Sequence, residues 1–472
     1  MIINGEGVTG DAWLTVVNPA TGEDLGRVPA AGADDVAAAM ASARCAQRDW
    51  AAVPDADRCA LLMQAADVLE ANAGPLAELI TAEQGKPLGG PGSMFEVEGA
   101  VAWTRVPASL ELPAETVFED DTRRDEMIRR PLGVIGAIAP WNWPVLIAIW
   151  QIVPSVRMGN TVVIKPSEFT PLATLEVVRL MNTVLPPGVV NAVSGDGEVG
   201  RRIVTSPEVA KIMFTGSVPT GREIMAASAP NLCRLTLELG GNDAAIVLPD
   251  VDPEAIAMDL FWGAFINMGQ TCACAKRLYV HDDIYEDVVA ALDAVAEGIP
   301  MGNGLEEGNL LGPVQNRPQF DKVVSLVDDA RARGARIVRG GRPLDGPGLF
   351  YPVTLVADID EDAPLVTEEQ FGPVLPILRY QLLDDAVARA NASPVGLGAS
   401  VWSSDPGRAE DVARRLDAGT VWINQHGVIH PMVPFGGSKQ SGFGLEFGIE
   451  GLKSVSRPQV ISHRKEAVAG AA

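Results

Sequence analysis

The sequence predicts an α/β protein with two doubly wound parallel-sheet domains and a separate β hairpin. Short apolar segments alternate with amphipathic helical segments over most of the chain, which is typical of βαβ units. The 472 residues exceed the ~250–300 at which one hydrophobic core stops growing, so more than one domain is expected. Residues 115–130 depart from this pattern, because charged and apolar side chains alternate there as in an exposed hairpin.

The composition is that of an ordinary globular protein with an acidic surface. Hydrophobic residues make up 47% and charged residues 21% of the chain, and 61 acidic against 37 basic residues give a net charge of −24. Such a surface repels nucleic-acid phosphates and anionic lipids, and no cluster of Lys and Arg offers a local exception. We therefore expect neither nucleic acid nor a membrane as a partner.

Cysteine and histidine usage excludes two further classes. The five cysteines are odd in number and too sparse for a disulfide framework, and the N-terminus lacks a secretory signal, so a cytoplasmic protein is expected. The four histidines are too scattered for a zinc site. His426 and His430 lie close together, but Gly427 and Pro431 place them in a loop without a third ligand, so no metal is expected.

The first predicted elements are a β turn and two helices. NPATG at 18–22 is typical of a turn between short strands at 15–17 and 24–28. Residues 34–50 and 55–84 have the 3.6-residue apolar spacing and the Ala, Leu and Glu content of helices.

Residues 132–156 carry no charge, which suggests a membrane helix. Pro140, Pro144 and Pro154 argue against that interpretation, because proline interrupts helices. We predict instead a buried strand at 134–139, a tight Pro-Trp-Asn-Trp-Pro turn and an apolar helix.

A parallel sheet continues from this strand. Its further elements are predicted as strand 161–164, helix 171–185, strand 188–193, strand 211–214 and a helix from Pro219. Ligands of doubly wound sheets bind at the carboxyl ends of the strands, so a dinucleotide site is expected there. The G-x-G-x-x-G match at 195–200 is weak support, because it follows the third strand and Glu208 fits the role of the acidic partner only loosely.

A second unit of the same kind begins near residue 244. Strands are predicted at 245–248, 278–280, 336–338, 352–355 and 374–380, and helices at 253–265, 285–296, 318–333 and 384–391.

The segment FINMGQTCACAKR, residues 265–277, holds Cys272 in a loop that follows the first of these helices. Backbone N–H groups in such a loop can stabilise the oxyanion that forms when a thiol attacks a carbonyl carbon. Taken alone, an unpaired cysteine is more often a buried small hydrophobe.

Several motifs follow one another in a recognisable order: PWNWP at 140–144, KPSE at 165–168, FTGS at 214–217, LELGGN at 237–242, FINMGQTC, EEQFGPV at 368–374 and PFGGSKQSGFG at 434–444. With NPATG they resemble the aldehyde dehydrogenase superfamily, the NAD(P)-dependent, non-acylating enzymes, over nearly the whole chain. The resemblance implies a Rossmann-like NAD-binding domain at 1–114 and 131–243, a catalytic domain at 244–433, a return to the cofactor domain at 434–453, and an oligomerisation arm at 115–130 and 454–472. The resemblance also implies a homodimer or homotetramer through this arm, and such pairing fits the marginal stability of an isolated hairpin.

The resemblance also implies a mechanism. Cys272 would attack the aldehyde carbon, and Asn142 with the Cys272 backbone N–H would hold the oxyanion. After hydride has passed to NAD⁺ a thioester remains, and Glu238 would activate the water that releases the acid. Glu446 is either a proton relay or a solvated surface acid, and the sequence leaves both interpretations open.

The implied cofactor is NAD. Lys165 and Glu168 would bind the adenosine ribose, and Glu168 would favour NAD⁺ over NADP⁺ because its carboxylate repels a 2′-phosphate. The other implied contacts are Trp141, Gly216 and Ser217 at the pyrophosphate, and Gln319, Lys322, Glu369 and Phe371 at the nicotinamide end.

The helix after PWNWP lines the aldehyde tunnel in the family. Relatives that oxidise carboxylate-bearing aldehydes often carry an Arg where this chain has Trp150, and Arg157 is expected to face away. With Ile147, Ile429 and Phe435 the tunnel would be apolar. An uncharged aromatic or medium-chain aliphatic aldehyde is therefore predicted, because a buried unpaired carboxylate costs several kcal/mol.

The alternatives are oxidation of a semialdehyde, a CoA-acylating enzyme, a cysteine hydrolase without hydride transfer, and a non-catalytic structural or binding protein on the same scaffold. Glu238 argues against CoA-acylating relatives, which generally lack that base. Intact Cys272, Glu238 and Asn142 argue against a non-catalytic scaffold.

Overall fold

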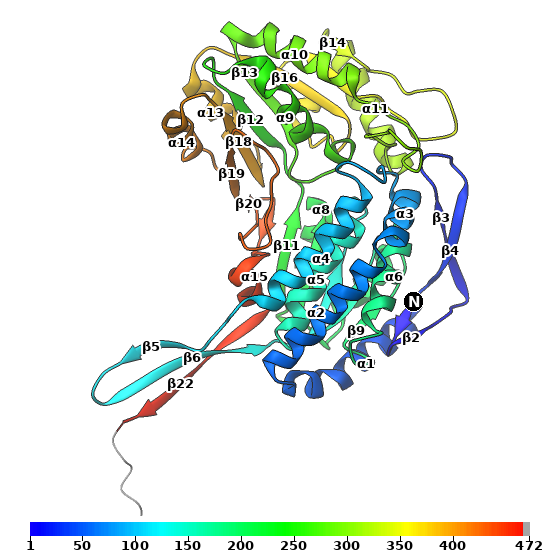
Figure 1. Cartoon of the computed structure of the whole chain (residues 1–472), viewed down its shortest axis with the longest axis vertical. Coiled ribbons are helices and arrows are strands. Elements are labelled where there is room, and N and C mark those ends of the chain that lie inside the picture. Colours follow the sequence, from blue (N-terminus) through cyan, green and yellow to red (C-terminus); the bar gives the residue numbers. More distant parts are fainter. Residues whose placement is uncertain (466–472) are drawn as a thin grey trace, which may run out of the picture.

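The computed structural model describes residues 1–465, which form two sheet-centred bodies and a projecting arm. Figure 1 shows one body above the other, with the arm leaving the lower one. Each body is built on a predominantly parallel sheet, so the predicted fold class is confirmed.

The lower body contains an eight-stranded sheet in the order β2-β1-β9-β8-β7-β10-β11-β21. The central strands β9-β8-β7-β10-β11 are parallel, and the direction of winding reverses between β7 and β10. The bounds are β1 (Ile2–Ile3), β2 (Glu6–Gly7), β7 (Val134–Ile138), β8 (Thr161–Lys165), β9 (Val190–Ala192), β10 (Val209–Gly216), β11 (Arg234–Leu239) and β21 (Gly442–Phe443).

Helices cover both faces of this sheet. Successive side chains of a strand point to opposite faces. Ile135 and Ala137 therefore pack with α2 to α6, and Val134 and Ile138 pack with α1, α7 and α8. The bounds are α1 (Ala33–Ala52), α2 (Asp55–Ala71), α3 (Ala73–Gln84), α4 (Ser93–Ser109), α5 (Pro144–Arg157), α6 (Leu172–Met181), α7 (Gly197–Thr205) and α8 (Val218–Ser228).

The prediction of one helix over residues 55–84 is wrong, because the segment forms α2 and α3 with a break at Asn72. Pro75 has no N–H, and its ring collides with the carbonyl four residues earlier, so the helix stops and restarts. Helix α4 and strand β11 were not predicted. Gly99 and Pro107 lie inside α4 and mask its periodicity.

The upper body contains a seven-stranded sheet in the order β14-β15-β16-β13-β12-β18-β19, parallel except at β14. Helix α9 has the predicted bounds, whereas β18, β19 and α14 were not predicted. The elements are β12 (Asp243–Val247), α9 (Pro253–Phe265), β13 (Ala275–His281), α10 (Tyr285–Gly298), α11 (Arg317–Ala332), β14 (Arg336–Arg339), β15 (Thr354–Ala357), α12 (Pro364–Thr367), β16 (Val374–Tyr380), α13 (Leu383–Asn391), β18 (Gly398–Trp402), α14 (Pro406–Ala413) and β19 (Thr420–Ile423).

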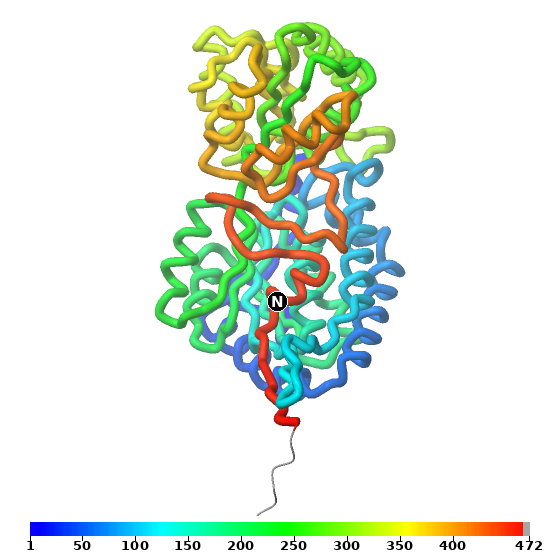
Figure 2. Tube along the Cα trace, turned by 90° about the vertical axis from the view of Figure 1, so that its left-hand side faces the viewer, coloured from blue at the N-terminus to red at the C-terminus, as the bar shows by residue number. Residues whose placement is uncertain are grey.

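The arm is an antiparallel sheet in the order β22-β6-β5, made from β5 (Glu115–Glu119), β6 (Arg123–Pro131) and β22 (Ser456–Arg464). Figures 1 and 2 show that it extends away from the lower body. Residues 466–472, the last part of the predicted arm segment, lie outside the described residues. The remaining elements are β3 (Ala12–Val17), β4 (Asp24–Ala30), β17 (Val395–Gly396), β20 (Ser438–Lys439), α15 (Gly448–Ser454) and the 3₁₀ turns η1 (Ala229–Asn231), η2 (Ile266–Gly269) and η3 (Asp282–Ile284). The domain boundaries remain a proposal.

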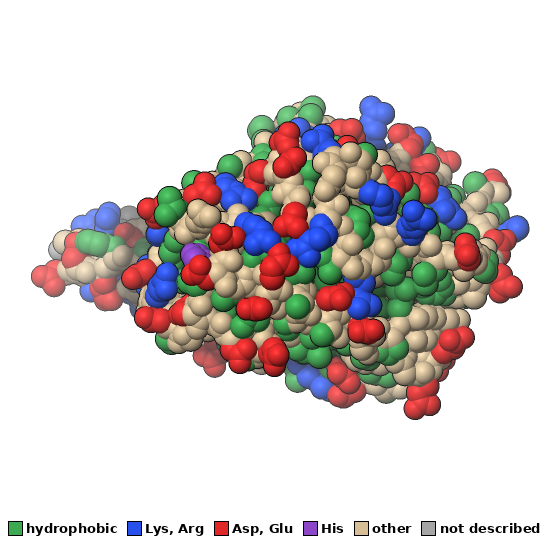
Figure 3. Space-filling model, turned by 90° about the horizontal axis from the view of Figure 1, so that it is seen from above, with side chains coloured by type: hydrophobic (Ala, Val, Ile, Leu, Met, Phe, Trp, Pro, Cys, Tyr) green, Lys and Arg blue, Asp and Glu red, His purple; other side chains and the backbone are tan. Residues whose placement is uncertain are grey.

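Acidic and basic side chains are interspersed on the face seen in Figure 3, so that face has no large area of a single charge. Within residues 1–465, no helix has the length and apolar character needed to cross a membrane. No group of three or more His, Cys, Asp or Glu side chains in the same range is placed to hold a metal ion.

Candidate active site

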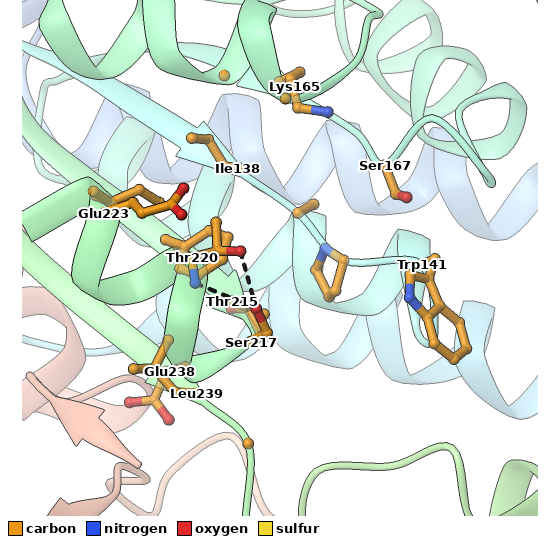
Figure 4. A pocket seen from close by; sticks show the side chains of 18 of the residues that line it. Ile138, Trp141, Lys165, Ser167, Thr215, Ser217, Thr220, Glu223, Glu238 and Leu239 are labelled. Atoms are coloured by element: carbon orange, nitrogen blue, oxygen red, sulfur yellow. Dashed lines mark hydrogen bonds between the residues drawn. The ribbon is translucent and has the colours of Figure 1, made fainter. Parts of the chain in front are cut away.

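A cleft of about 1140 Å³ lies at the carboxyl ends of β7, β8 and β10 and reaches into the upper body. It occupies the point where the winding of the lower sheet reverses, which is where doubly wound sheets bind their ligands. Figure 4 shows Lys165, Ser217 and Glu238 around part of this cleft, each at the end of a different strand. Distant segments of the chain thus meet at one site.

The cleft brings together every residue predicted for catalysis and cofactor binding. These residues are Trp141, Asn142, Lys165, Glu168, Gly216, Ser217, Glu238, Cys272, Gln319, Lys322, Glu369 and Phe371. The predicted substrate residues Ile147, Trp150, Ile429 and Phe435 do not line the cleft. They belong to, or pack against, the apolar cluster described below.

Cys272 follows a tightly wound turn at the end of α9. Asn267 and Met268 adopt left-handed backbone conformations, with φ of 50° and 60°, which non-glycine residues rarely do. The Gln270 side chain donates to the Asn267 carbonyl oxygen at 3.0 Å, and the Asn142 side chain donates to the Gln270 carbonyl oxygen at 2.9 Å. These bonds hold Asn142 against the loop that carries Cys272.

The Cys272 side chain is partly exposed to the cleft but is otherwise enclosed by protein. Burial raises the pKa of its thiol, and the carboxylates of Glu369, Glu238 and Asp243 raise it further. The protonated thiol is therefore the resting form at neutral pH. The thiol must therefore lose its proton before the sulfur becomes a nucleophile.

Glu238 lies near the end of β11, and its side chain faces the cleft. Both of its carboxyl oxygens are buried without a hydrogen-bond partner among residues 1–465. Burial raises the pKa of Glu238 well above its usual range, and the neighbouring Glu446 adds to the shift. An unpartnered carboxyl group with a raised pKa is suited to accept and return a proton near neutral pH.

Glu446 is only 4% exposed, so its interpretation as a solvated surface acid is wrong. Its backbone pairs with Phe435 in both directions, which turns the side chain inward. Burial raises the pKa of Glu446 to about 7, although Lys211 opposes the shift. Lys211 in turn has its pKa lowered to about 8 by burial. The three side chains are buried and interact electrostatically, Glu446 with both Glu238 and Lys211.

The outer part of the cleft offers groups suited to a dinucleotide. Ser217 caps the N-terminus of α8, where it accepts a hydrogen bond from the Thr220 N–H at 3.4 Å, and helix N-termini attract phosphate. The Lys165 ammonium group donates to two backbone carbonyl oxygens and lies 3.7 Å from Glu168. A cleft of this size with a helix N-terminus beside a cation and a carboxylate fits a dinucleotide.

Glu369 reaches across the inner cleft to the glycines after β11. Its carboxylate accepts a hydrogen bond from the Gly241 N–H at 3.2 Å, and a Cβ at Gly240 would lie only 2.1 Å from it. Lys322 donates to the Glu369 carbonyl oxygen at 2.6 Å. Burial raises the pKa of Glu369 to about 7, opposed by Lys276 and Lys322. Gly241, which follows the last residues of β11, therefore holds the carboxyl group of Glu369, while Lys322 of α11 holds its backbone.

Behind Cys272 lies an apolar cluster that contains the predicted substrate residues. The ring of Trp150 packs 4.6 Å from Phe447, which stacks on Phe435 at 5.8 Å, and Trp103 adds a further ring beside Trp150. Ile147 belongs to the same cluster, and Ile429 and Cys272 pack against it. Arg157 pairs with Asp55 and the Leu110 carbonyl oxygen on another side of the lower body, so it faces away as predicted.

Sequence reasoning missed part of the site. The N-terminal turn of α7 lines the cleft through Gly197, Glu198, Gly200 and Arg201. The G-x-G-x-x-G pattern at 195–200 marks this turn, but its place after the third strand makes it weak evidence. Helix α8 adds Thr220, Glu223, Ile224, Ala226 and Ala227, for which no sequence signal was available.

This fold and this site define a dinucleotide-binding type of α/β protein with a cysteine and an unpartnered carboxyl group at the inner end of the cleft. The model of the aldehyde dehydrogenase family matches residues 8–461. The chain belongs to that family, so the resemblance seen in the motifs is confirmed.

Individual relatives match this chain over almost its full length. A protein named "Probable aldehyde dehydrogenase" from a Pseudomonas species is 41% identical, and the match covers 96% of this chain and 92% of the relative. A phenylacetaldehyde dehydrogenase from Pseudomonas fluorescens is 39% identical, with 98% and 96% covered. The solved NAD⁺ complex of an aldehyde dehydrogenase from Bacillus cereus superposes with a TM-score of 0.95 at 34% identity, with 99% and 96% covered.

Proposed function

We propose that the chain oxidises an uncharged aromatic or medium-chain aliphatic aldehyde to its carboxylic acid with NAD⁺ as the electron acceptor. The observation that carries this proposal is the juxtaposition of Cys272, Asn142 and the unpartnered Glu238 carboxyl group at the inner end of a dinucleotide-sized cleft. The apolar cluster behind Cys272 supports the substrate class.

Residues from both bodies would hold the cofactor along the cleft. Lys165 and Glu168 would bind the adenosine ribose, and Ser217 with the N-terminus of α8 would bind the pyrophosphate, with Trp141 and Gly216 beside it. Gln319, Lys322, Glu369 and Phe371 would hold the nicotinamide end. When bound there, NAD⁺ supplies the acceptor for one hydride.

The first half of the reaction joins Cys272 to the aldehyde. The Cys272 thiol gives its proton to water in the cleft, the sulfur attacks the aldehyde carbon, and the carbonyl oxygen becomes an oxyanion. The Asn142 side chain and the Cys272 backbone N–H stabilise that oxyanion, and removing one such donor typically slows a reaction by about 10²–10³-fold. Loss of hydride from this thiohemiacetal restores the C=O bond and leaves a thioester on Cys272.

The second half releases the acid. Glu238 takes a proton from water as the water oxygen attacks the thioester carbon, and the carbon–sulfur bond breaks to release the Cys272 thiolate, which regains a proton from water. Glu446 is buried and interacts electrostatically with Glu238, and we assign to it the onward transfer of the proton through water. One water is consumed, and the products are the carboxylic acid, NADH and one proton.

The substrate class gives a direct prediction. We expect kcat/KM for benzaldehyde and hexanal to exceed that for succinic semialdehyde by at least about tenfold, because a carboxylate brought against the apolar cluster behind Cys272 loses its hydration without a partner. A spectrophotometric assay of NADH formation over this panel measures the difference.

A matched pair of substrates controls for size and ring chemistry. Benzaldehyde and 4-carboxybenzaldehyde differ only by the carboxylate, so the same preference should appear between them. A higher kcat/KM for either carboxylate-bearing aldehyde would contradict the apolar assignment and favour the semialdehyde alternative. An aldehyde with a quaternary ammonium tail belongs in the panel, because aromatic side chains also attract cations.

Cofactor choice gives a second prediction. Glu168 would repel the 2′-phosphate of NADP⁺, while Lys165 at 3.7 Å softens the repulsion. We expect kcat/KM for NAD⁺ to exceed that for NADP⁺ by roughly 10²-fold, and Glu168→Gln to raise the NADP⁺ value about tenfold. Glu208→Gln is the control, because Glu208 pairs with Arg44 away from the cleft. If Glu168→Gln leaves the ratio of kcat/KM for NAD⁺ to that for NADP⁺ unchanged, Glu168 does not determine which cofactor is used.

We also assign subunit assembly to the arm. Both of its outer strands are edges, and Val117, Phe118, Val460 and Ile461 are exposed on them, as on a surface that pairs with another chain. The molar mass from light scattering should be that of a dimer or tetramer. Val460→Lys should shift the oligomer distribution toward smaller species. A monomeric parent chain would contradict this assignment.

All five cysteines are free, which supports a cytoplasmic location, and cell fractionation tests it.

A further inference from the structure

Lys86 and Glu96 form a buried ion pair for which the proposed reaction has no use. Lys86 lies in the loop after α3, Glu96 lies in the first turn of α4, and neither lines the cleft. The side chains of both residues have no exposed surface, and the Nζ–Oε2 distance is 2.6 Å. The pair is therefore shielded from solvent and from the substrate.

Both side chains reach the segment that carries Asn142. The other carboxylate oxygen of Glu96 accepts hydrogen bonds from the Val145 and Leu146 N–H groups, at 2.9 and 3.1 Å, and so caps α5. The Lys86 ammonium group donates to the Asn142 carbonyl oxygen at 2.8 Å. It also lies 3.5 Å from the centre of the Trp143 ring.

The same carbonyl group is tied to the loop of Cys272. The Asn267 side chain donates to the Asn142 carbonyl oxygen at 2.8 Å, and the Asn142 side chain donates to the Gln270 carbonyl oxygen at 2.9 Å. Two donors on one carbonyl oxygen fix the peptide plane after Asn142. Fixing that plane fixes the direction in which the Asn142 side chain leaves the backbone.

Stability alone does not account for this arrangement. Transferring two charges out of water costs several kcal/mol each, and apolar replacements of buried ion pairs are often as stable or more so. Burial lowers the pKa of Lys86 to about 8, which reflects that cost. Stabilisation of an oxyanion, in contrast, requires donors held in place before the reaction begins.

We propose that Lys86 and Glu96 are positioning residues, which act through Asn142 to hold its side-chain amide where the thiohemiacetal oxyanion forms. Glu96 fixes the start of α5, and Lys86 fixes the carbonyl group of Asn142 itself. The proposal rests on the role of Asn142 in the proposed function. It predicts an effect on the acylation step and none on cofactor binding.

The test compares Lys86→Met with the double variant Lys86→Met/Glu96→Gln. We expect the NADH burst of both to be at least about tenfold slower than in the parent chain, with NAD⁺ affinity changed by less than about twofold. Lys86→Met leaves a buried unpaired carboxylate and should lower the unfolding temperature, whereas the double variant should recover much of it. A burst rate that recovers together with the unfolding temperature would overturn the proposal.

Glu83 provides a matched control. Its buried carboxylate accepts hydrogen bonds from the Leu172 and Ala173 N–H groups and so caps α6 in the same way, but α6 carries no residue of the cleft. Glu83→Gln should therefore lower stability and leave the burst rate within about twofold. An equal loss of burst rate in Glu83→Gln would show that general destabilisation explains both effects.

Asn142→Ala separates this inference from the proposed function. If Lys86 acts through Asn142, Lys86→Met should change the burst rate by less than about twofold when Asn142 is already alanine. Additive losses would overturn the positioning role. A normal burst rate in Asn142→Ala alone would instead refute the proposed role of Asn142.

Discussion

Cys272→Ala is expected to abolish aldehyde oxidation while NAD⁺ binding persists. The sulfur makes the covalent bond to the substrate, so steady-state turnover should fall by at least roughly 10⁴-fold. The groups that hold the cofactor are separate side chains along the cleft, so NAD⁺ affinity should change little. NADH formation measures the first quantity, and quenching of tryptophan fluorescence by NAD⁺ measures the second.

Cys274 gives the matched control for this variant. It lies two residues further along the same loop, but its side chain is buried away from the cleft. Cys274→Ala should lower stability by about 1 kcal/mol and leave turnover within about twofold. Aldehyde oxidation by Cys272→Ala near the parent rate would refute the covalent mechanism.

Glu238→Gln is expected to separate the two halves of the reaction. Acylation depends on Cys272 and Asn142, so one NADH per active site should still form in a burst. The water that releases the acid would then lack its base, and steady turnover should fall by roughly 10²–10³-fold. Stopped-flow measurement of NADH gives the amplitude of the burst and the rate that follows it. Loss of the burst in proportion to turnover would assign Glu238 to the earlier step.

The rate of thioester hydrolysis should also depend on pH, in a direction that follows from the pKa of Glu238. Burial and Glu446 raise the pKa of Glu238, and the neutral carboxyl group that predominates below that pKa cannot accept a proton from water. The rate of thioester hydrolysis should therefore rise with pH through the pKa of this coupled pair and then level off. Glu238→Gln should lose this rise. Added hydroxylamine, which attacks thioesters without a protein base, should restore NADH turnover in the variant.

Local sequence determined much of the fold and the content of the site. The alternation of strands and helices depends on residues close together in the chain, and α9 therefore has the bounds that its apolar spacing and Pro253 predict. The motifs that follow β7, β8, β10 and β11 supply groups at strand ends. Because parallel strands end at one edge of their sheet, these groups meet in one cleft, and sequence reasoning could place them together.

Local sequence patterns predicted the elements less well where tertiary packing determines whether and where an element forms. The break between α2 and α3 depends on Pro75 within an otherwise regular apolar pattern, and α4 was hidden by Gly99 and Pro107. The G-x-G-x-x-G pattern at the start of α7 is weak evidence by itself, because it follows the third strand along the chain. The structure shows that this turn nevertheless faces the cleft.

By itself the sequence determined the family, the fold class and the identities of the groups in the cleft, since these depend on motifs and on periodicity along the chain. Only the tertiary structure decided that Glu446 is buried beside Glu238, that Lys86 bonds the Asn142 carbonyl group, and that Glu96 caps the helix that follows it. The physical reason is that desolvation and hydrogen bonding depend on which distant segments pack together. A glutamate or a lysine is written with its same letter in the sequence whether water or protein surrounds its side chain.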